Sequence, residues 1–339
     1  MPRIAAIAPI SFLVAGLLTL AASGPALAWG ADGHRMIGEL AMRSLPSSLP
    51  AFLRTPAATA QVGFLSPEAD RIRGAGMVND RDRDPAHFID TDDEMKSLGG
   101  PALNALPPTR EEYDTALRAV NQSQYKAGYL PYEMIAGYEL VRKNMALWRL
   151  AVMAARMAPT AAERARWAAD RRRRETRLID TIGVWSHFVG DGSQPLHSSI
   201  HYNGWGNFPN PQGFTTERIH TPFESAYVRA NVSAAMVRAA MPAPVDCACA
   251  INARVSNYLV ASAEQVVPLY RLEKGGAFNA ATGEGIRFST GMVARGAAEL
   301  RDLVAMAWKD SDNALVGYPG VKITDLENGG AAAFKTFNE

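Results

Sequence analysis

Apolar residues recur at three- and four-residue spacing along most of this chain, which is the period of an amphipathic helix. Period-two alternation is nearly absent, so the pattern predicts an all-α protein. Within the longest periodic stretch, Trp167, Leu178, Ile182, Trp185 and Val189 would form one buried stripe. We expect helices over residues 34–45, 110–123, 131–157, 160–190, 218–240, 250–271 and 287–308.

Helix-breaking residues gather between these stretches. Residues 47–84 are rich in Pro, Gly and charge, and residues 202–219 in Gly, Asn and Pro, so we expect both to be irregular. Residues 311–339 are rich in Gly and Ala, and we expect a poorly ordered tail there. Because no linker divides the rest, residues 29–310 are expected to form a single-domain multi-helix bundle with long loops.

The first 28 residues have the pattern of a cleaved secretory signal. Arg3 precedes an apolar run, and Ala26-Leu27-Ala28 is a small-residue cleavage site. A membrane anchor is the alternative, but the run is short, and Gly24 and Pro25 interrupt it. We therefore expect cleavage before Trp29 and a secreted or periplasmic protein.

Composition narrows the picture only slightly. The chain has 339 residues, of which 47% are hydrophobic, as in ordinary globular proteins. Its 35 basic and 34 acidic residues give no strong indication of a partner. Two cysteines exclude a cysteine-built metal site; Cys247 and Cys249 either form a disulfide or remain thiols. The arginine run 171–174 favours a solvated helix face, with a surface for phosphate or anionic lipid as the alternative.

Histidine–carboxylate pairs carry the candidate chemistry, since phosphate-loop, serine-hydrolase and H-E-x-x-H motifs are absent. His187 and Asp191 are four residues apart, as are His220 and Glu224, so each pair would share one helix face. A buried ion pair is the alternative reading of either pair.

Further histidines make a metal site the better interpretation. His34, His87 and His197 bring the donors to more than one zinc requires. Nitrogen and carboxylate donors without thiolate suit zinc, and other divalent metals stay open. His201 would be a spare histidine, on the surface or outside the first layer of ligands.

One stretch resembles a known signature. The pattern His187-Phe188-x-Gly190-Asp191-x-x-Gln194-Pro195-Leu196-His197 is similar to that of the zinc-dependent single-strand-specific nucleases of fungi and plants, which share their fold with the bacterial zinc phospholipases C. Further family motifs follow the same order from Trp29 to Glu224: Trp29-Gly30-x-x-Gly33-His34, Ala69-Asp70-x-x-Arg73, His87-Phe88-Ile89-Asp90 and His220-x-x-x-Glu224.

The resemblance implies a cleft with three zinc ions. The first would be held by Asp70, His87 and His187, and Asp191 would bridge it to the second. The second would also use His34 and the α-amino group and carbonyl of Trp29. The third would be held by His197, His220 and Glu224. Because an α-amino group has a pKa near 8 in isolation, a cation can displace its proton once cleavage frees it.

The resemblance also implies a mechanism. Two bridged zincs would lower the pKa of a shared water toward about 7, and the hydroxide would attack phosphorus. Asp70 would orient it, and Arg73 would neutralise charge on the phosphate oxygens. Phe88 and Asp90 would form a nucleoside pocket, with the Phe88 ring stacked on a base and the Asp90 carboxylate accepting from its edge.

Three functions follow, in order of preference. The first is a hydrolase, an endonuclease of single-stranded DNA and RNA that also acts on 3′-nucleotides; the loop 203–207 favours it. The second is a phospholipase C acting on phospholipid head groups, which the Phe223-Glu224 pair favours. The third is a zinc-binding protein without catalysis. No protein partner is implied.

Overall fold

The computed structural model describes residues 29–279 and 282–335, with side chains through Gly330. The predicted signal peptide, residues 1–28, lies outside the described residues. The all-α prediction is confirmed, since the strands are two residues each. The major helices are α1 (Gly30–Arg43), α2 (Pro56–Leu65), α3 (Glu68–Arg71), α4 (Met77–Arg83), α5 (Arg110–Arg118), α6 (Gln124–Ala127), α7 (Leu130–Met157), α8 (Ala161–Asp191), α9 (Val228–Asn231), α10 (Ala234–Ala240), α11 (Ile251–Ala263), α12 (Val266–Lys274), α13 (Gly283–Asp310) and α14 (Ile323–Lys335).

Shorter elements connect these helices. A π-helical segment, η5 (Pro222–Tyr227), precedes α9. Strands β1 (Leu315–Val316) and β2 (Val321–Lys322) pair antiparallel before α14. Single 3-10 turns are η1 (Ala51–Arg54), η2 (Asp84–His87), η3 (Leu103–Ala105), η4 (Pro195–His197) and η6 (Ser311–Asn313).

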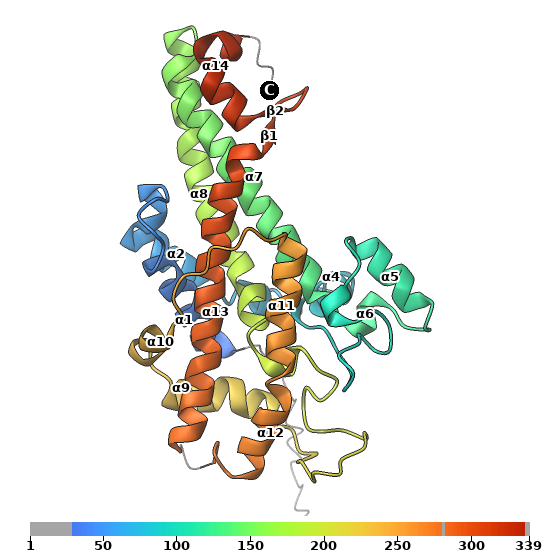
Figure 1. Cartoon of the computed structure of the whole chain (residues 1–339). Helices are drawn as coiled ribbons and strands as arrows, with labels where there is room; N and C mark the ends of the chain where they lie inside the picture. Colours follow the sequence, from blue (N-terminus) through green and yellow to red (C-terminus); the bar gives the residue numbers. More distant parts are fainter. Residues whose placement is uncertain (1–28, 280–281, 336–339) are drawn as a thin grey trace, which may run out of the picture.

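Helices α7 and α8 form a long antiparallel hairpin. Its lower half packs in the body against α13, α1 and α2, while its upper half projects away (Figure 1). A capping box begins α8: Thr160 accepts from the Glu163 backbone, and the Glu163 carboxylate accepts from the Thr160 backbone. The helix then runs without a break to Asp191, so it carries its last turns deep into the body.

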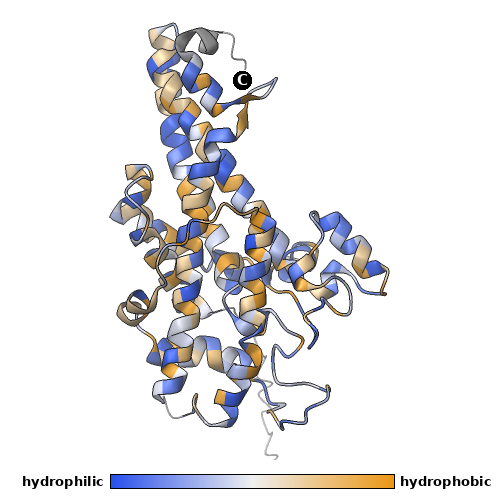
Figure 2. Ribbon diagram, viewed as in Figure 1, coloured by the Kyte–Doolittle hydropathy of each residue, from blue (hydrophilic) through white to orange (hydrophobic). Residues whose placement is uncertain are grey.

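Two hydrophobic clusters stabilise the two halves. The larger lies in the body among α1, α7, α8, α11 and α13. The smaller lies along the projecting half, where Leu150 and Trp167 meet Val316, Ile323 and Leu326. Figure 2 shows hydrophobic and hydrophilic residues interspersed along the long helices, as expected of amphipathic helices.

The described part of residues 311–339, where a poorly ordered tail was expected, contains η6, β1, β2 and α14. Ile323 and Leu326 are almost fully buried against the hairpin, and this apolar contact holds α14 in place despite its Gly- and Ala-rich sequence. Residues 336–339 lie outside the described part.

Four other expectations differ from the structure. Residues 47–84 contain η1 and the short helices α2 to α4, of which α3 and α4 bury no residue and so show no apolar period. Residues 218–240 are divided into η5, α9 and α10, and residues 250–271 into α11 and α12. The helix predicted to reach residue 123 ends at Arg118, and Asn121 beyond it has a φ of 58°. The predicted loop at 202–219 contains none of the helices or strands.

The structure also shows the state of the two cysteines and of the arginine run on α8. Cys247 and Cys249 form a disulfide. On α8, Arg172 and Arg173 are exposed, and Arg174 pairs with Asp170 at 2.7 Å, as on a solvated helix face. Within the described residues, no helix combines the length and the apolar character that crossing a membrane requires.

The surroundings of two helical glycines predict the effect of replacing each with alanine. Gly137 on α7 faces Trp185, and an added Cβ would lie 1.9 Å from its Cδ1. We expect Gly137→Ala to lower the free energy of unfolding by about 1–3 kcal/mol through overpacking. Gly291 on α13 faces open space, so Gly291→Ala should raise it by about 0.5–1 kcal/mol through helix propensity. Urea unfolding measures both, and equal effects would contradict the packing argument.

Candidate metal centre

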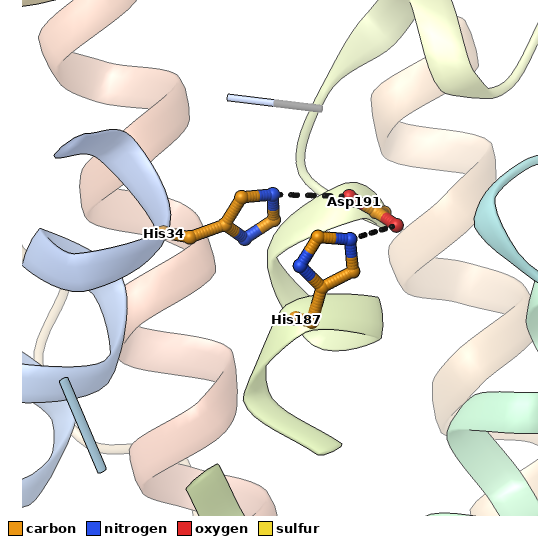
Figure 3. Close-up of side chains that lie close together, drawn as sticks. All are labelled: His34, His187 and Asp191. Atoms are coloured by element: carbon orange, nitrogen blue, oxygen red, sulfur yellow. Dashed lines mark ion pairs between the residues drawn. The ribbon is translucent and has the colours of Figure 1, made fainter. Parts of the chain in front are cut away.

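The last two turns of α8 carry His187 and Asp191, both fully buried. The Asp191 carboxylate faces histidines on two sides. Its Oδ1 lies 3.4 Å from His34 Nε2, and its Oδ2 lies 3.1 Å from His87 Nδ1 and 3.4 Å from His187 Nε2. Figure 3 shows His34 on α1 and His187 on α8 both directed at this carboxylate. His34, His187 and Asp191 form the first group of donors. Because His87 also faces the Asp191 carboxylate, this side chain is placed where it can contact two cations.

Trp29 and Gly190 fix the approach of α1 to α8. The buried Trp29 indole donates to the Gly190 carbonyl at 3.0 Å and to Ser193 Oγ at 2.8 Å. A Cβ on Gly190 would lie only 2.8 Å from His34 Nδ1, so a larger residue there would push the histidine away. The start of the described chain is thus held beside His34.

A second group joins Asp70, His87 and His187. Asp70 Oδ1 is 3.9 Å from His87 Nδ1 and 3.7 Å from His187 Nε2, and those two nitrogens are 3.0 Å apart. His187 Nδ1 lies 2.9 Å from the Ser66 carbonyl and must donate to it. The neutral ring therefore turns the lone pair of Nε2 toward the group.

A third group joins His197, His220 and Glu224. The His197 and His220 Nε2 atoms are 3.0 Å apart, and Glu224 Oε2 is 2.8 Å from the latter and 3.7 Å from the former. His197 Nδ1 donates to the His87 carbonyl at 2.6 Å, which links this group to the second. Gln194 donates to Glu224 at 3.0 Å and orients it.

The three groups fit divalent metal ions. In each, one donor atom per residue lies within 4.8 Å of the others. Buried polar atoms without partners are costly, and here they concentrate at the groups. Atoms without a hydrogen bond to any described residue include both His34 ring nitrogens, Asp70 Oδ1, Asp191 Oδ1 and Glu224 Oε1. Facing nitrogen lone pairs repel one another unless a cation or proton lies between them. These buried clusters can therefore hold metal ions.

Shifted pKa values show that the site favours positive charge. Burial alone would lower the pKa of His197, but Asp191 and Glu224 raise it to about 9. Burial would raise the pKa of Asp191, yet His187 and His197 hold it well below its usual range. Burial raises the pKa of Asp70 to about 7. A proton thus occupies part of this site when a metal does not.

A cavity of about 450 Å³ opens beside the second and third groups; we call it the metal cavity. Predicted site residues and others line it together: Arg73, His87, Phe88, Asp90, Lys126, Leu196, His197, Tyr202 and His220. Arg73 Nη1 lies 3.6 Å from Asp70 Oδ1, and Arg73 Nε lies 3.5 Å from Asp84 Oδ1. Burial raises the pKa of Asp90 to about 8, while His197 lowers it.

Sequence reasoning missed Lys126 and Tyr202, and of its two positions for His201 the one outside the first layer of ligands agrees with the structure. Lys126 carries no motif signal, whereas Tyr202 directly precedes the loop 203–207, which could have indicated it. His201 is 2% exposed, so a surface position is wrong. Its ring stacks on Trp205 at 3.7 Å, Nδ1 donates to the Trp205 carbonyl, and Nε2 lies 3.0 Å from Asp93. It therefore supports the loop.

Comparisons with known proteins add no assignment. No protein-family model, no curated protein and no solved structure matches this chain. The interpretation of the site therefore depends on its own residues and geometry.

The shared position of Asp191 predicts unequal metal losses. We expect Asp191→Asn to lower the metal content more than Glu224→Gln, because Asp191 faces the histidines of two groups and Glu224 those of one. The measurement is elemental analysis of protein stripped with chelator, reloaded and dialysed. His201→Asn is the control, since this buried histidine is in none of the groups and should retain the original content. Equal losses in the two carboxylate variants would contradict a shared ligand.

Proposed function

We propose that the chain is a zinc-dependent phosphodiesterase of the single-strand-specific nuclease family, cleaving single-stranded DNA or RNA. One observation carries the proposal. Eight residues predicted as ligands from separate motifs gather in three adjoining buried groups: His34, Asp70, His87, His187, Asp191, His197, His220 and Glu224. Motifs that lie far apart in the sequence thus supply donor atoms to the same groups, which supports metal-dependent chemistry at this site.

We assign three zinc ions to these groups. The first ion would be held by Asp70, His87 and His187. The second would be held by His34 and by the terminal amino group and carbonyl of Trp29. Asp191 would be a ligand of both ions. His197, His220 and Glu224 would hold the third. Nitrogen and oxygen donors without thiolate suit zinc. When bound, such ions polarise phosphate oxygens and lower the pKa of water toward about 7.

Asp70 and Arg73 would do the chain's own part of the chemistry. Asp70 is 7% exposed, and its Oδ1 lies 3.6 Å from Arg73 Nη1 and 3.7 Å from His187 Nε2, so it would orient a water molecule held between the metal groups and Arg73. Arg73 lines the metal cavity and would bind the non-bridging phosphate oxygens, where negative charge builds up in the transition state. Their partial burial strengthens both interactions, because little water screens them.

Phe88 and Asp90 would bind the nucleoside. Both line the metal cavity. An aromatic ring stacks on any base, and the Asp90 carboxylate would accept a hydrogen bond from its edge. Single-stranded nucleic acid is favoured as the partner because a base must leave a duplex to reach such a pocket.

A phospholipase C is the second candidate, and a specific observation favours it. A cavity of about 850 Å³ shares Phe88 with the metal cavity. Met77 and Val78 line its rim and are 73% and 81% exposed, and nearby in sequence Ile72 is 47% exposed. Exposed apolar side chains beside a site are a means of approaching a lipid surface. A metal-binding protein without catalysis is third, since Asp70 and Arg73 suit the chemistry more than they suit stability.

We also propose secretion or export to a periplasm, because a free amino group at Trp29 requires removal of the preceding residues. Trp29 is fully buried beside His34, next to the groups that the amino group would complete.

A paired assay tests the proposed function. The chain beginning at Trp29 should cleave single-stranded DNA and RNA but not phosphatidylcholine, and chelator should abolish the activity until zinc is restored. Arg73→Ala should lower kcat by about 10²–10³-fold, as loss of a transition-state donor does, with metal content unchanged. Arg71→Ala, two residues away and bonded to Glu68, is the matched control and should keep activity. Lipid turnover without nucleic acid cleavage would overturn the proposal.

The terminal amino group gives a second test. A chain that retains Ala28 should lose most of its activity and part of its zinc, because an amide nitrogen cannot replace an amine as a ligand. A fusion with a removable leader supplies the control, since the same preparation can be assayed before and after release of Trp29. Full activity before release would show that the amino group is not a ligand.

A further inference from the structure

A second cavity of about 450 Å³ continues the metal cavity on one side; we call it the side groove. The two cavities share Asp90, Lys126 and Tyr202 as lining residues. The Tyr202 ring centroid is 6.5 Å from that of His220, so this ring stands directly beside the third metal group. A ligand seated at the metal groups can therefore extend into the side groove without leaving the protein surface.

The loop that forms the side groove is tightly built. Trp205 is 5% exposed, its backbone N–H donates to Thr215, and its indole donates to Pro209. Gly204 has a φ of 93°, and a Cβ there would lie 2.5 Å from the Thr216 carbonyl, so the two arms of the loop touch. These contacts fix the backbone that presents the neighbouring side chains.

On this fixed loop, two aromatic side chains face water while two others are buried. Tyr202 is 49% exposed and Phe208 is 43% exposed, whereas Trp205 and Phe214 are each 5% exposed. Exposed rings on a rigid loop lose little conformational entropy on binding and offer flat faces for stacking.

The charge of the side groove is basic. Lys126 and Arg218 line it, both are exposed, and neither forms an ion pair with any residue in the described part of the chain. Asp90 is the acidic residue of its lining. The 850 Å³ cavity on the other side has Asp80, Asp82 and Asp84 against the single cation Arg81. A polyanion leaving the metal groups would therefore follow the side groove.

We infer that the side groove is a second nucleotide subsite, in which Tyr202 and Phe208 stack on a base and Lys126 and Arg218 contact backbone phosphates. The inference rests on the proposed nuclease function and specifies its substrate as an oligonucleotide or polynucleotide. The nucleoside pocket at Phe88 and the side groove would hold the nucleosides on the two sides of the cleaved phosphate.

Kinetics on substrates of different length test this subsite. The zinc-loaded protein would be assayed on the oligonucleotide dT8 and on thymidine 3′-monophosphate, which carries one nucleoside and nothing beyond its phosphate. Tyr202→Ala and Phe208→Ala should each lower kcat/KM for dT8 by about 5- to 100-fold, the usual effect of losing one stacked base. Phe208 lines the side groove but not the metal cavity, so Phe208→Ala should change the one-nucleoside reaction less than about twofold. Tyr202→Phe keeps the ring and should keep the activity on dT8.

Matched controls come from the acidic cavity. Tyr125 is 48% exposed and lines that cavity, so Tyr125→Ala is an equivalent loss of an exposed ring and should not discriminate by length. Arg218→Gln should weaken dT8 binding and reduce the slope of log Kd against log salt by about 0.7, as for one lost phosphate contact to a single strand. Arg81→Gln should leave that slope unchanged.

The outcomes separate the subsite from the proposed function. Equal losses of Phe208→Ala on both substrates, or no loss on either, would overturn the subsite. If the unmodified protein cleaves neither nucleotide substrate, the proposed function fails, and fluorescence anisotropy with labelled dT8 then decides the subsite alone. Binding that Tyr202→Ala weakens at least fivefold would support the groove, and unchanged or absent binding would overturn it.

Discussion

The structure depends on one buried carboxylate that histidines approach from two sides. Asp191 has no access to solvent, and its two oxygens face His34 on α1 and both His87 and His187. Placing so many donor atoms together without water is unfavourable, since each buried polar group must find a partner. The arrangement is stable only with positive charge among the donors. A metal ion meets this requirement, and the raised pKa of His197 shows a proton meeting part of it.

The long helices serve this arrangement by making it rigid. Helix α8 is one uninterrupted element from Ala161 to Asp191, and α1, α2 and α13 pack against it. The histidines are then oriented through their remaining nitrogens by the Ser66 and His87 carbonyls. Such outer hydrogen bonds fix the ring orientation and the tautomer of a ligand, as in known metal sites. The fold thus positions the donors before any cation binds.

Helical periodicity is sufficient to predict the helix that carries His187 and Asp191, and insufficient for the elements that carry the other donors. The spacing of His187 and Asp191 places both on one helix face, and the structure has them there. The distances that bring Asp70 and His34 to the same pair depend on tertiary packing, which no local pattern encodes. The short helices α3 and α4 bury no residue, so they leave no period to detect. In α14, by contrast, a few buried apolar residues outweigh a composition typical of a loose tail.

The residues around the metal groups distinguish between possible substrates better than the metal groups themselves. Clusters of this kind would activate an ester of phosphate in either a nucleic acid or a lipid, and Glu224 takes part in its group without distinguishing them. The two sides of the site differ in charge, however. Acidic residues and exposed Met77 and Val78 border one side, and Lys126, Arg218 and two exposed rings border the other. A lipid head group needs only the metal cavity, whereas a basic aromatic groove matches a chain of phosphates and bases. The side groove therefore favours nucleic acid over lipid, although the acidic side retains the apolar rim that a lipid surface would use.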